Sequence, residues 1–305
     1  MSKRGILLLG GGGFLGISIA RGLSSEDFSV HIVTPHAVSE IASNVIIHQG
    51  SMDDQKILEK VLPHCKTIIH LASSTNPGNS ARHPALEAEN NLKPSLNFME
   101  ALQICEAFHL IFVSSGGTVY GNPTTIPVNE DYPLCPISYY GAGKIALEIF
   151  FRTLAKPPKK NVTIVRPSNL YGPGQSLHQG FGVIRTMLEH VLCGTTMEIW
   201  GDGNTVRDFL YIQDMVNAIK LLISLPTDNG VYNIGASIGY SLNQLRTIIE
   251  KVCHKKLKVK YRTERSTDVR HVVLDSSRFI RKTGWRPETS LEDGVLLTWQ
   301  SIKNK

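Results

Sequence analysis

A tyrosine and a lysine four residues apart are the strongest candidates for acid–base chemistry in this chain of 305 residues. Tyr140 and Lys144 belong to the run SYYGAGK at residues 138–144, whose pattern predicts the start of a helix. Helical spacing places the two side chains on one face. A neighbouring ammonium stabilises a phenolate and lowers the pKa of tyrosine from its usual value of about 10. The pair therefore indicates a proton donor or acceptor that works near neutral pH.

A glycine-rich run close to the N-terminus indicates a dinucleotide site. Residues 10–16 read GGGGFLG and follow a short apolar run, so they form the predicted turn between a strand and a helix. The first glycine of such a turn permits the tight bend, the second lets the backbone approach a pyrophosphate, and the third lets the helix pack closely on the strand. The phosphate rests on the helix N-terminus. We expect the cofactor to contact Gly10, Gly13, Phe14, Leu15 and Gly16.

The end of the second predicted strand leaves NAD and NADP both open as the cofactor. A site for NAD usually presents Asp or Glu to the ribose 2′-hydroxyl at this point. Here the strand ends in Thr34-Pro35-His36, without an acid. Thr34 offers a hydrogen bond to a hydroxyl or to a phosphate, whereas His36 is not a fixed cation.

A doubly wound α/β fold is predicted to position these residues. In the first half of the chain, near-continuous apolar runs alternate with helical patterns, which is typical of a parallel sheet covered on both faces. The predicted strands are 5–9, 30–34, 45–48, 67–71, 110–114 and 162–166, and the predicted helices are 15–23, 54–62, 84–107 and 140–155. Ligands of such Rossmann-like folds bind at the carboxyl ends of the strands.

A change of texture near residue 167 indicates a second region. Short loops with glycine and proline separate helical patterns at 183–193 and 242–253. We therefore expect a dinucleotide-binding domain over residues 1–166. Residues 167–305 are expected to form mainly a smaller α+β substrate-binding region, with some segments returning to the first domain.

Composition narrows the class of protein. Hydrophobic residues make up 42% of the chain. When the 26 glycines are added and the 9 tyrosines removed, the apolar share is roughly 48%, an ordinary globular value that argues against a disordered or coiled-coil protein. The net charge of +6 is mild, and the densest basic run, residues 255–260, alternates like an amphipathic strand, so no nucleic-acid partner is expected. Five cysteines without a CxxC spacing predict neither a disulfide framework nor a metal site, and favour the cytoplasm. No apolar run reaches the ~18 residues that span a membrane.

Several further motifs complete the pattern: IHLA at 69–72, ENNL at 89–92, VSSGGTVYG at 113–121, RPSNLYGPG at 166–174, WGDG at 200–203, VRDF at 206–209, YNIG at 232–235 and TGWRP at 283–287. With the glycine turn and the Tyr–Lys pair, they make the chain resemble the extended short-chain dehydrogenase/reductase family. The resemblance is to nucleotide-sugar epimerases of the UDP-glucose 4-epimerase type, and it covers essentially the whole chain.

The resemblance implies three catalytic positions. Tyr140 takes or gives a proton of the sugar hydroxyl, and Lys144 tunes the tyrosine and binds the nicotinamide ribose. A Ser or Thr normally holds the sugar oxygen, but the aligned position is Gly116. Thr118 is the first candidate to replace it and Ser115 the second. The alternative is that these hydroxyls only satisfy backbone groups at the strand end.

Cofactor and substrate contacts are implied in the same way. Cofactor contacts fall on Thr34, Met52, Leu71, Ala72, Ser73 and Asn91, with Tyr140 and Lys144. The family often has an acid before the aliphatic residue beside adenine, yet here Ser51 precedes Met52, and Asp53 is the candidate substitute. Asn169 matches a residue of the substrate pocket. Arg207 and Arg265 match arginines that hold a diphosphate with paired hydrogen bonds, surface ion pairs being the alternative for each.

The implied activity is that of a nucleotide-sugar 4-epimerase that transiently oxidises C4 of the sugar with NAD or NADP. A nucleotide-linked 4-ketosugar reductase that uses the same residues is the alternative, and a non-catalytic cofactor-binding regulator is a third. Gly116-Gly117 lacks the acidic pair of the family's dehydratases. The expected partners are a nucleotide-diphosphate sugar and, from the resemblance, a second copy in a homodimer, with no membrane.

Overall fold

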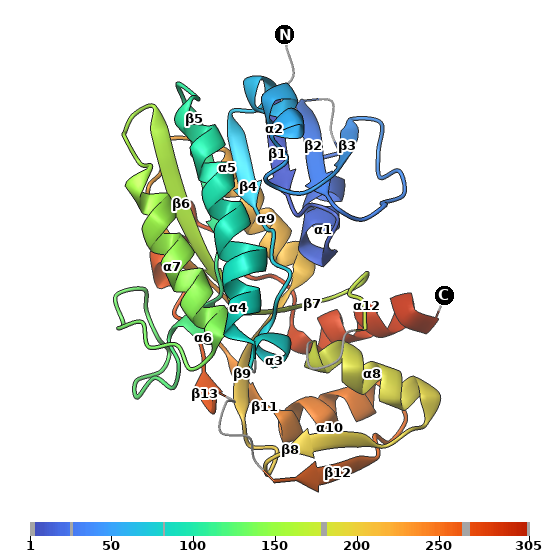
Figure 1. Cartoon of the computed structure of the whole chain (residues 1–305). Helices are drawn as coiled ribbons and strands as arrows, with labels where there is room; N and C mark the ends of the chain where they lie inside the picture. Colours follow the sequence, from blue (N-terminus) through green and yellow to red (C-terminus); the bar gives the residue numbers. More distant parts are fainter. Residues whose placement is uncertain (1–3, 25–26, 82, 178–181, 264–268, 304–305) are drawn as a thin grey trace. The chain divides into compact units, whose positions relative to one another are not determined.

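The computed structural model describes residues 4–24, 27–81, 83–177, 182–263 and 269–303 (Figure 1). The chain forms two compact units. The first unit comprises residues 1–114, 139–165 and 216–232, and the second comprises 115–138, 166–215 and 233–305. This division places residues 115–138 in the second unit, whereas the sequence-based boundary at residue 166 assigns them to the first domain.

A seven-stranded sheet in the order β10-β6-β5-β4-β1-β2-β3 forms the framework of the fold. Its strands are β1 (Arg4–Leu9), β2 (Phe28–Thr34), β3 (Val45–Gln49), β4 (Thr67–His70), β5 (Phe108–Val113), β6 (Lys160–Pro167) and β10 (Val231–Ile234). Strands β1 to β6 pair in parallel. The predicted Rossmann-like α/β fold is thus confirmed, and β10 is a strand outside the predicted set. The strand order reverses between β1 and β4, where such folds bind ligands.

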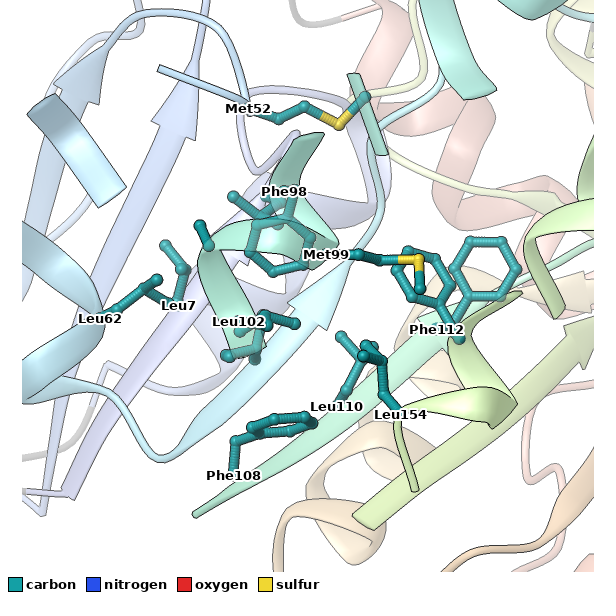
Figure 2. Close-up of a cluster of buried hydrophobic side chains, with 14 of the residues drawn as sticks. Leu7, Met52, Leu62, Phe98, Met99, Leu102, Phe108, Leu110, Phe112 and Leu154 are labelled. Atoms are coloured by element: carbon teal, nitrogen blue, oxygen red, sulfur yellow. The ribbon is translucent and has the colours of Figure 1, made fainter. Parts of the chain in front are cut away.

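Helices cover both faces of this sheet. In the first unit they are α1 (Phe14–Gly22), α2 (Gln55–Val61), α3 (Pro77–Ser80), α4 (Pro84–Glu87), α5 (Lys93–Gln103), α7 (Tyr139–Thr153), the C-terminal part of α9 (Ile212–Ile223) and the short 3-10 turn η1 (Leu62–His64). Figure 1 shows α5 and α7 side by side in front of the sheet, with α9 behind it. Side chains of α2, α5 and α7 form a buried core against the sheet, in which Phe98, Leu102, Phe108 and Phe112 take part (Figure 2).

The predicted single helix over 84–107 is wrong in its middle. A π-helical turn, η2 (Ala88–Leu92), separates α4 from α5. Pro94 lies in the first turn of α5 and has no N–H to donate to the carbonyl of Asn90. The Ser74 hydroxyl donates to this carbonyl instead, at 3.3 Å. The proline therefore accounts for the local change of helical period.

The second unit contains two small sheets and its own core. The strands β7 (Asn169–Tyr171), β9 (Val206–Tyr211), β11 (Gly239–Ser241) and β13 (His271–Val272) form one sheet, and β8 (Met197–Trp200) with β12 (Val259–Arg262) forms the other. The helices are α6 (Gly116–Val119), α8 (Val183–Cys193), α10 (Leu242–Cys253), α11 (Ser277–Thr283) and α12 (Leu291–Lys303). Helices α8 and α10 have the bounds that the sequence predicts. Within the described residues, no helix has the length and hydropathy needed to cross a bilayer.

Candidate active site

In the turn between β1 and α1, packing requires glycine at positions 10, 11, 12 and 16 but not at position 13. Gly10 has a φ of +76°, and a Cβ atom there would lie 2.5 Å from the Cα of Ala72. A Cβ on Gly16 would lie 2.4 Å from the Cα of Gly11. Gly13 is exposed and would meet its nearest atom only at 3.6 Å. The open backbone at Gly13 therefore marks the face on which a phosphate can rest at the start of α1.

The loop after β4 adjoins this glycine turn. The backbone N–H of Leu71 donates to the carbonyl of Leu9 at 2.9 Å, and Ala72 is the residue against which Gly10 packs. Ser73 is exposed, and its hydroxyl donates to the carbonyl of Thr75 at 3.2 Å. Phe14 and Leu15 are half-buried at the first positions of α1. The structure thus brings two of the predicted cofactor segments together.

Asn91, in the π-helical turn, has every hydrogen-bonding position of its amide engaged by protein groups. Its Oδ1 accepts from the Ser74 N–H at 2.9 Å and from the Ser74 hydroxyl at 3.2 Å. Its Nδ2 donates to Thr75 Oγ1 at 2.7 Å and to Glu87 Oε1 at 3.0 Å. An amide has two donor hydrogens and two acceptor lone pairs, so none is left over. The side chain therefore holds the loop after β4.

The residues expected near the adenosine of the cofactor have mainly protein neighbours. Thr34 is 2% exposed at the end of β2, and its hydroxyl accepts weakly from the His36 N–H at 3.4 Å. Met52 belongs to the buried core (Figure 2). Burial raises the pKa of Asp53, but hydrogen bonds from Ser51 and Asn97 outweigh it, so the pKa is lowered overall. Strand β2, which ends at Thr34, contains no acidic residue.

Tyr140 and Lys144 lie together at the start of α7. The Lys144 side chain is 4% exposed, and its Nζ donates to the carbonyl of Val113 at 3.2 Å. Nζ lies 5.6 Å from the ring centroid of Tyr140 and 5.2 Å from that of Phe112. Burial lowers the pKa of Lys144 to about 8, although Glu87 and Glu148 act to raise it. The pKa of this buried ammonium is therefore much closer to neutral pH than that of an ordinary lysine.

The two buried carboxylates near Lys144 are residues that sequence reasoning missed. Glu148 is 3% exposed and accepts a hydrogen bond from the Ser114 hydroxyl. It follows Lys144 by one helical turn, so the spacing that revealed the Tyr–Lys pair also pointed to it. Glu87 is 4% exposed on α4. No local pattern connects Glu87 to α7, and only the fold brings the two together.

The turn after β5 departs from the family pattern for a steric reason. A Cβ on Gly116 would lie 2.5 Å from Leu274 Cδ1 and 2.9 Å from the Arg166 carbonyl oxygen. The usual hydroxyl position therefore has no room for any side chain. Thr118 is half-buried and its hydroxyl donates to the Ser115 carbonyl at 3.4 Å, a long hydrogen bond. Ser115 makes no side-chain cap to α6.

Asn169 lies beside this turn in the second unit. A Cβ on Gly117 would be 3.7 Å from Asn169 Nδ2 and 3.8 Å from Oδ1, ordinary contact distances. Asn169 Nδ2 donates to the Asp208 carbonyl at 2.9 Å. Arg207, in the adjoining strand β9, is half-buried and its Nη1 donates to the Val206 carbonyl at 2.9 Å. Arg265 lies outside the described residues.

Asp208 is a further buried carboxylate that the sequence did not single out. It is 1% exposed and accepts hydrogen bonds from the N–H groups of Ala236 at 2.9 Å, Ser237 at 3.1 Å and Leu274 at 3.3 Å. Burial raises its pKa to about 6, against the lowering effect of these donors. Its carboxylate therefore anchors the segment that contains Leu274, the residue that closes the space over Gly116.

Comparison with known proteins gives consistent matches along the chain. Residues 6–235 match the NAD dependent epimerase/dehydratase family. A putative UDP-glucose 4-epimerase of Methanocaldococcus jannaschii is 30% identical, over 98% of this chain and 99% of that protein. A dTDP-4-dehydro-6-deoxyglucose reductase of Escherichia coli is also 30% identical, over 99% of both chains.

Solved structures match as closely. The UDP-glucose 4-epimerase of Thermotoga maritima, a structure with UDP-glucose, has a TM-score of 0.91 and 31% identity over 99% of both chains. These matches agree with the parallel α/β sheet found here. The resemblance inferred from the motifs is confirmed, and the chain belongs to the NAD dependent epimerase/dehydratase family of enzymes.

Proposed function

We propose that this protein is a nucleotide-diphosphate-sugar 4-epimerase. The observation that carries the proposal is the half-buried Tyr140 beside the buried ammonium of Lys144. This is the arrangement that proton exchange with a sugar hydroxyl requires. Full-length matches to proteins named UDP-glucose 4-epimerase support C4 as the reacting carbon and a UDP-sugar as the substrate class.

The first unit supplies the cofactor side of the proposed site. The exposed backbone at Gly13, at the N-terminus of a nine-residue helix, fits a pyrophosphate. The Leu71–Ser73 loop adjoins the same turn and contributes the next contacts, with Asn91 acting through the loop that it holds. Bound NAD supplies the reversible oxidation at C4. Thr34 and Met52 are assigned to the adenosine end of the cofactor site.

Tyr140 acts as the acid and base of the proposed reaction. Its phenolate takes the proton of the 4-hydroxyl, and the phenol returns it after the sugar has presented its other face. Lys144 stabilises the phenolate through its positive charge. The hydroxyl of Thr118, or else that of Ser115, holds the reacting oxygen in place of the side chain that Gly116 lacks.

The second unit supplies the proposed substrate-binding groups. Asn169 lies next to Gly117 and receives the sugar, while Arg207 and Arg265 hold the diphosphate. A guanidinium suits this task because its fork bonds two phosphate oxygens. Binding energy then comes from the part of the substrate that does not react, and the sugar stays free to turn.

A 4-ketosugar reductase is the second candidate. It is favoured by the full-length match to the dTDP-4-dehydro-6-deoxyglucose reductase, and by the lack of an acid at the end of β2. A looser contact with the cofactor ribose suits an enzyme that must exchange its cofactor at each turnover.

One experiment separates the two activities. Purified protein is incubated with UDP-glucose, other nucleotide-diphosphate sugars and a nucleotide-linked 4-ketosugar, with and without NADH or NADPH. We expect inversion at C4, an unchanged product mass and no net consumption of cofactor. Reduction of the ketosugar with equal consumption of NADH or NADPH would instead identify a reductase. Nucleotide binding without turnover of any sugar would identify a regulator.

We also propose that two copies pair through α7. Ile149 is 62% exposed and Phe150 is 43% exposed on this helix, which leaves adjacent apolar side chains in water. Light scattering is expected to give the mass of a dimer, and Ile149→Glu to shift it towards the monomer. A wild-type protein that remains monomeric at high concentration would contradict this pairing.

A cytoplasmic location is proposed on the state of the thiols. All five cysteines are free, and Cys135 and Cys193 are exposed. Exposed thiols persist in a reducing compartment. Fractionation of cells that produce the protein is expected to recover it in the cytoplasmic fraction.

A further inference from the structure

Glu87 is a buried carboxylate to which the proposed reaction assigns no role. It ends α4 in the first unit, directly before the π-helical turn. It accepts hydrogen bonds from the Thr75 hydroxyl and from Asn91 Nδ2, the latter at 3.0 Å. Two donors hold the carboxylate in one orientation, which lowers the cost of burying its charge. The π-helical turn brings one of these donors into place.

The carboxylate of Glu87 occupies the space above Gly143 on α7. A Cβ atom on Gly143 would lie 2.3 Å from Glu87 Oε1, 2.7 Å from its Cγ and 2.8 Å from its Cδ. Only a glycine leaves room for the carboxyl group at this point. Gly143 directly precedes Lys144, so the contact joins α4 to α7 at the catalytic lysine.

The charged groups around Lys144 come from several elements. Glu87 on α4 is the foremost group that raises the pKa of Lys144, and Glu148 on α7 is the second. His70, at the end of β4, faces the same region, and burial lowers its pKa to about 3, so it is neutral at physiological pH. Tyr140 completes the set. Glu87 is therefore the leading negative charge that offsets the burial of this ammonium.

We propose that Glu87 is a positioning residue that keeps Lys144 charged beside Tyr140 and sets the place of α7 through its contact over Gly143. The inference rests on the proposed roles of Tyr140 and Lys144. It connects the loop after β4 to the acid–base pair, because Thr75 and Asn91 hold both that loop and Glu87. A change in the position of the loop after β4 then alters the surroundings of Lys144 through the carboxylate of Glu87.

Glu87→Gln tests the charge while keeping the shape of the side chain. Loss of a negative charge lets the protons of the Tyr140–Lys144 pair leave more readily. We expect the alkaline limb of the pH profile of kcat to move by about one unit to lower pH. Glu89→Gln is the matched control, because Glu89 stands in the same π-helical turn but is exposed. Its profile is expected to coincide with that of the wild type.

A direct titration of Lys144 gives a readout that does not depend on the sugar reaction. Protein labelled with ¹³C-lysine is titrated by NMR, and the Lys144 signal is identified as the one missing in Lys144→Met. We expect the midpoint to fall by about one unit in Glu87→Gln and to stay unchanged in Glu89→Gln. Absence of epimerase activity in the wild type would refute the proposed function but leave this titration valid.

Gly143→Ala keeps the charge of Glu87 but pushes the carboxylate away from α7, so it guards against a Glu87→Gln protein that does not fold. We expect the Lys144 midpoint to fall in this variant too. If both variants lower the melting temperature while the Lys144 midpoint and the pH profile match those of the wild type, Glu87 only packs, and the proposal is overturned.

Discussion

Two glycine turns, residues 10–16 in the first unit and 116–117 in the second, can be compared position by position. Packing within the chain requires Gly10 and Gly116, whose added Cβ atoms would each lie 2.5 Å from a neighbouring carbon atom. Gly13 and Gly117 differ, because their nearest atoms would lie at 3.6 and 3.7 Å. Gly117 stands within α6 and has no positive φ, so alanine there would be favoured by ~0.5–1 kcal/mol. The proposed function offers one explanation for both of these glycines, namely that a ligand approaches the bare backbone.

The same comparison separates the chemistry of the two units. In the first unit the acid–base pair that the resemblance implies, Tyr140 and Lys144, lies on α7. In the second unit Leu274 closes the usual hydroxyl position, and the proposed reaction therefore assigns the hydroxyl to a neighbouring residue. Variants can therefore test whether each unit makes the contribution assigned to it.

The largest effect is expected from Tyr140→Phe in the first unit. Loss of the phenolic proton should lower kcat by about 10²- to 10⁴-fold, the range for general acid–base catalysis. Binding of the nucleotide sugar, measured by calorimetry, should persist because the ring remains. An unchanged kcat would show that Tyr140 is not the acid and base, and the first unit would then lack the catalytic group assigned to it.

Acid should weaken the first unit and strengthen the second. Burial lowers the pKa of His70 to about 3 and of His109 to about 4, from 6.5. Their stabilising effect is complete above pH 6.5 and is lost as the pH falls below it, by roughly 4 kcal/mol together at pH 5. Burial raises the pKa of Asp208 to about 6, so its ionised carboxylate destabilises the second unit at pH 7. This destabilisation becomes smaller by about 1 kcal/mol when the pH falls to 5.

Hydrogen exchange followed by mass spectrometry resolves these opposite effects. Peptides from β4 and β5 should lose protection between pH 7 and pH 5, after correction for the intrinsic exchange rate. Peptides from β9 should keep or gain protection relative to them. Equal changes in both groups of peptides would show that the buried histidines and Asp208 do not set the acid response.

Thr118→Val tests the displaced hydroxyl of the second unit. One hydrogen bond to a charge-developing oxygen is worth about 2–4 kcal/mol, so kcat should fall roughly 30- to 1000-fold. Ser115→Ala is the matched control and should have a much smaller effect. A severe Ser115→Ala with a neutral Thr118→Val would reassign the role to Ser115. Two neutral variants would mean that backbone or water holds the sugar oxygen.

The smallest effects come from the two glycines of the second turn. Gly116→Ala should destabilise the fold by about 1–3 kcal/mol, because the added carbon overfills a packed site. Gly117→Ala should leave the melting temperature unchanged or slightly raised, yet increase KM for the nucleotide sugar several-fold. If Gly117→Ala has a wild-type KM, the open face beside Asn169 does not receive the substrate.

Local pattern in the sequence was enough for the elements that carry the first unit's chemistry. The apolar runs of β1, β2, β4, β5 and β6 reveal strands because a strand buried on both faces needs no partner residue to be recognised, whereas the edge strand β3 is only partly buried. The Tyr140–Lys144 spacing is likewise set by the helix alone. Pro94 is a local sign, within the sequence itself, that the predicted helix over 84–107 is interrupted, because proline cannot donate a helical hydrogen bond. The helical period of the apolar residues nevertheless favoured one continuous helix.

Contacts between distant segments were decided only by the tertiary structure. Glu87 meets Gly143, Leu274 closes the space over Gly116, and the amide of Asn91 is fully engaged by Glu87 and the loop after β4. Each depends on where two separate elements pack, and neither element's own periodicity contains that information. Helical and strand periods report which face of an element is buried, whereas the partner on that face is fixed by the order of strands and the packing of helices on them.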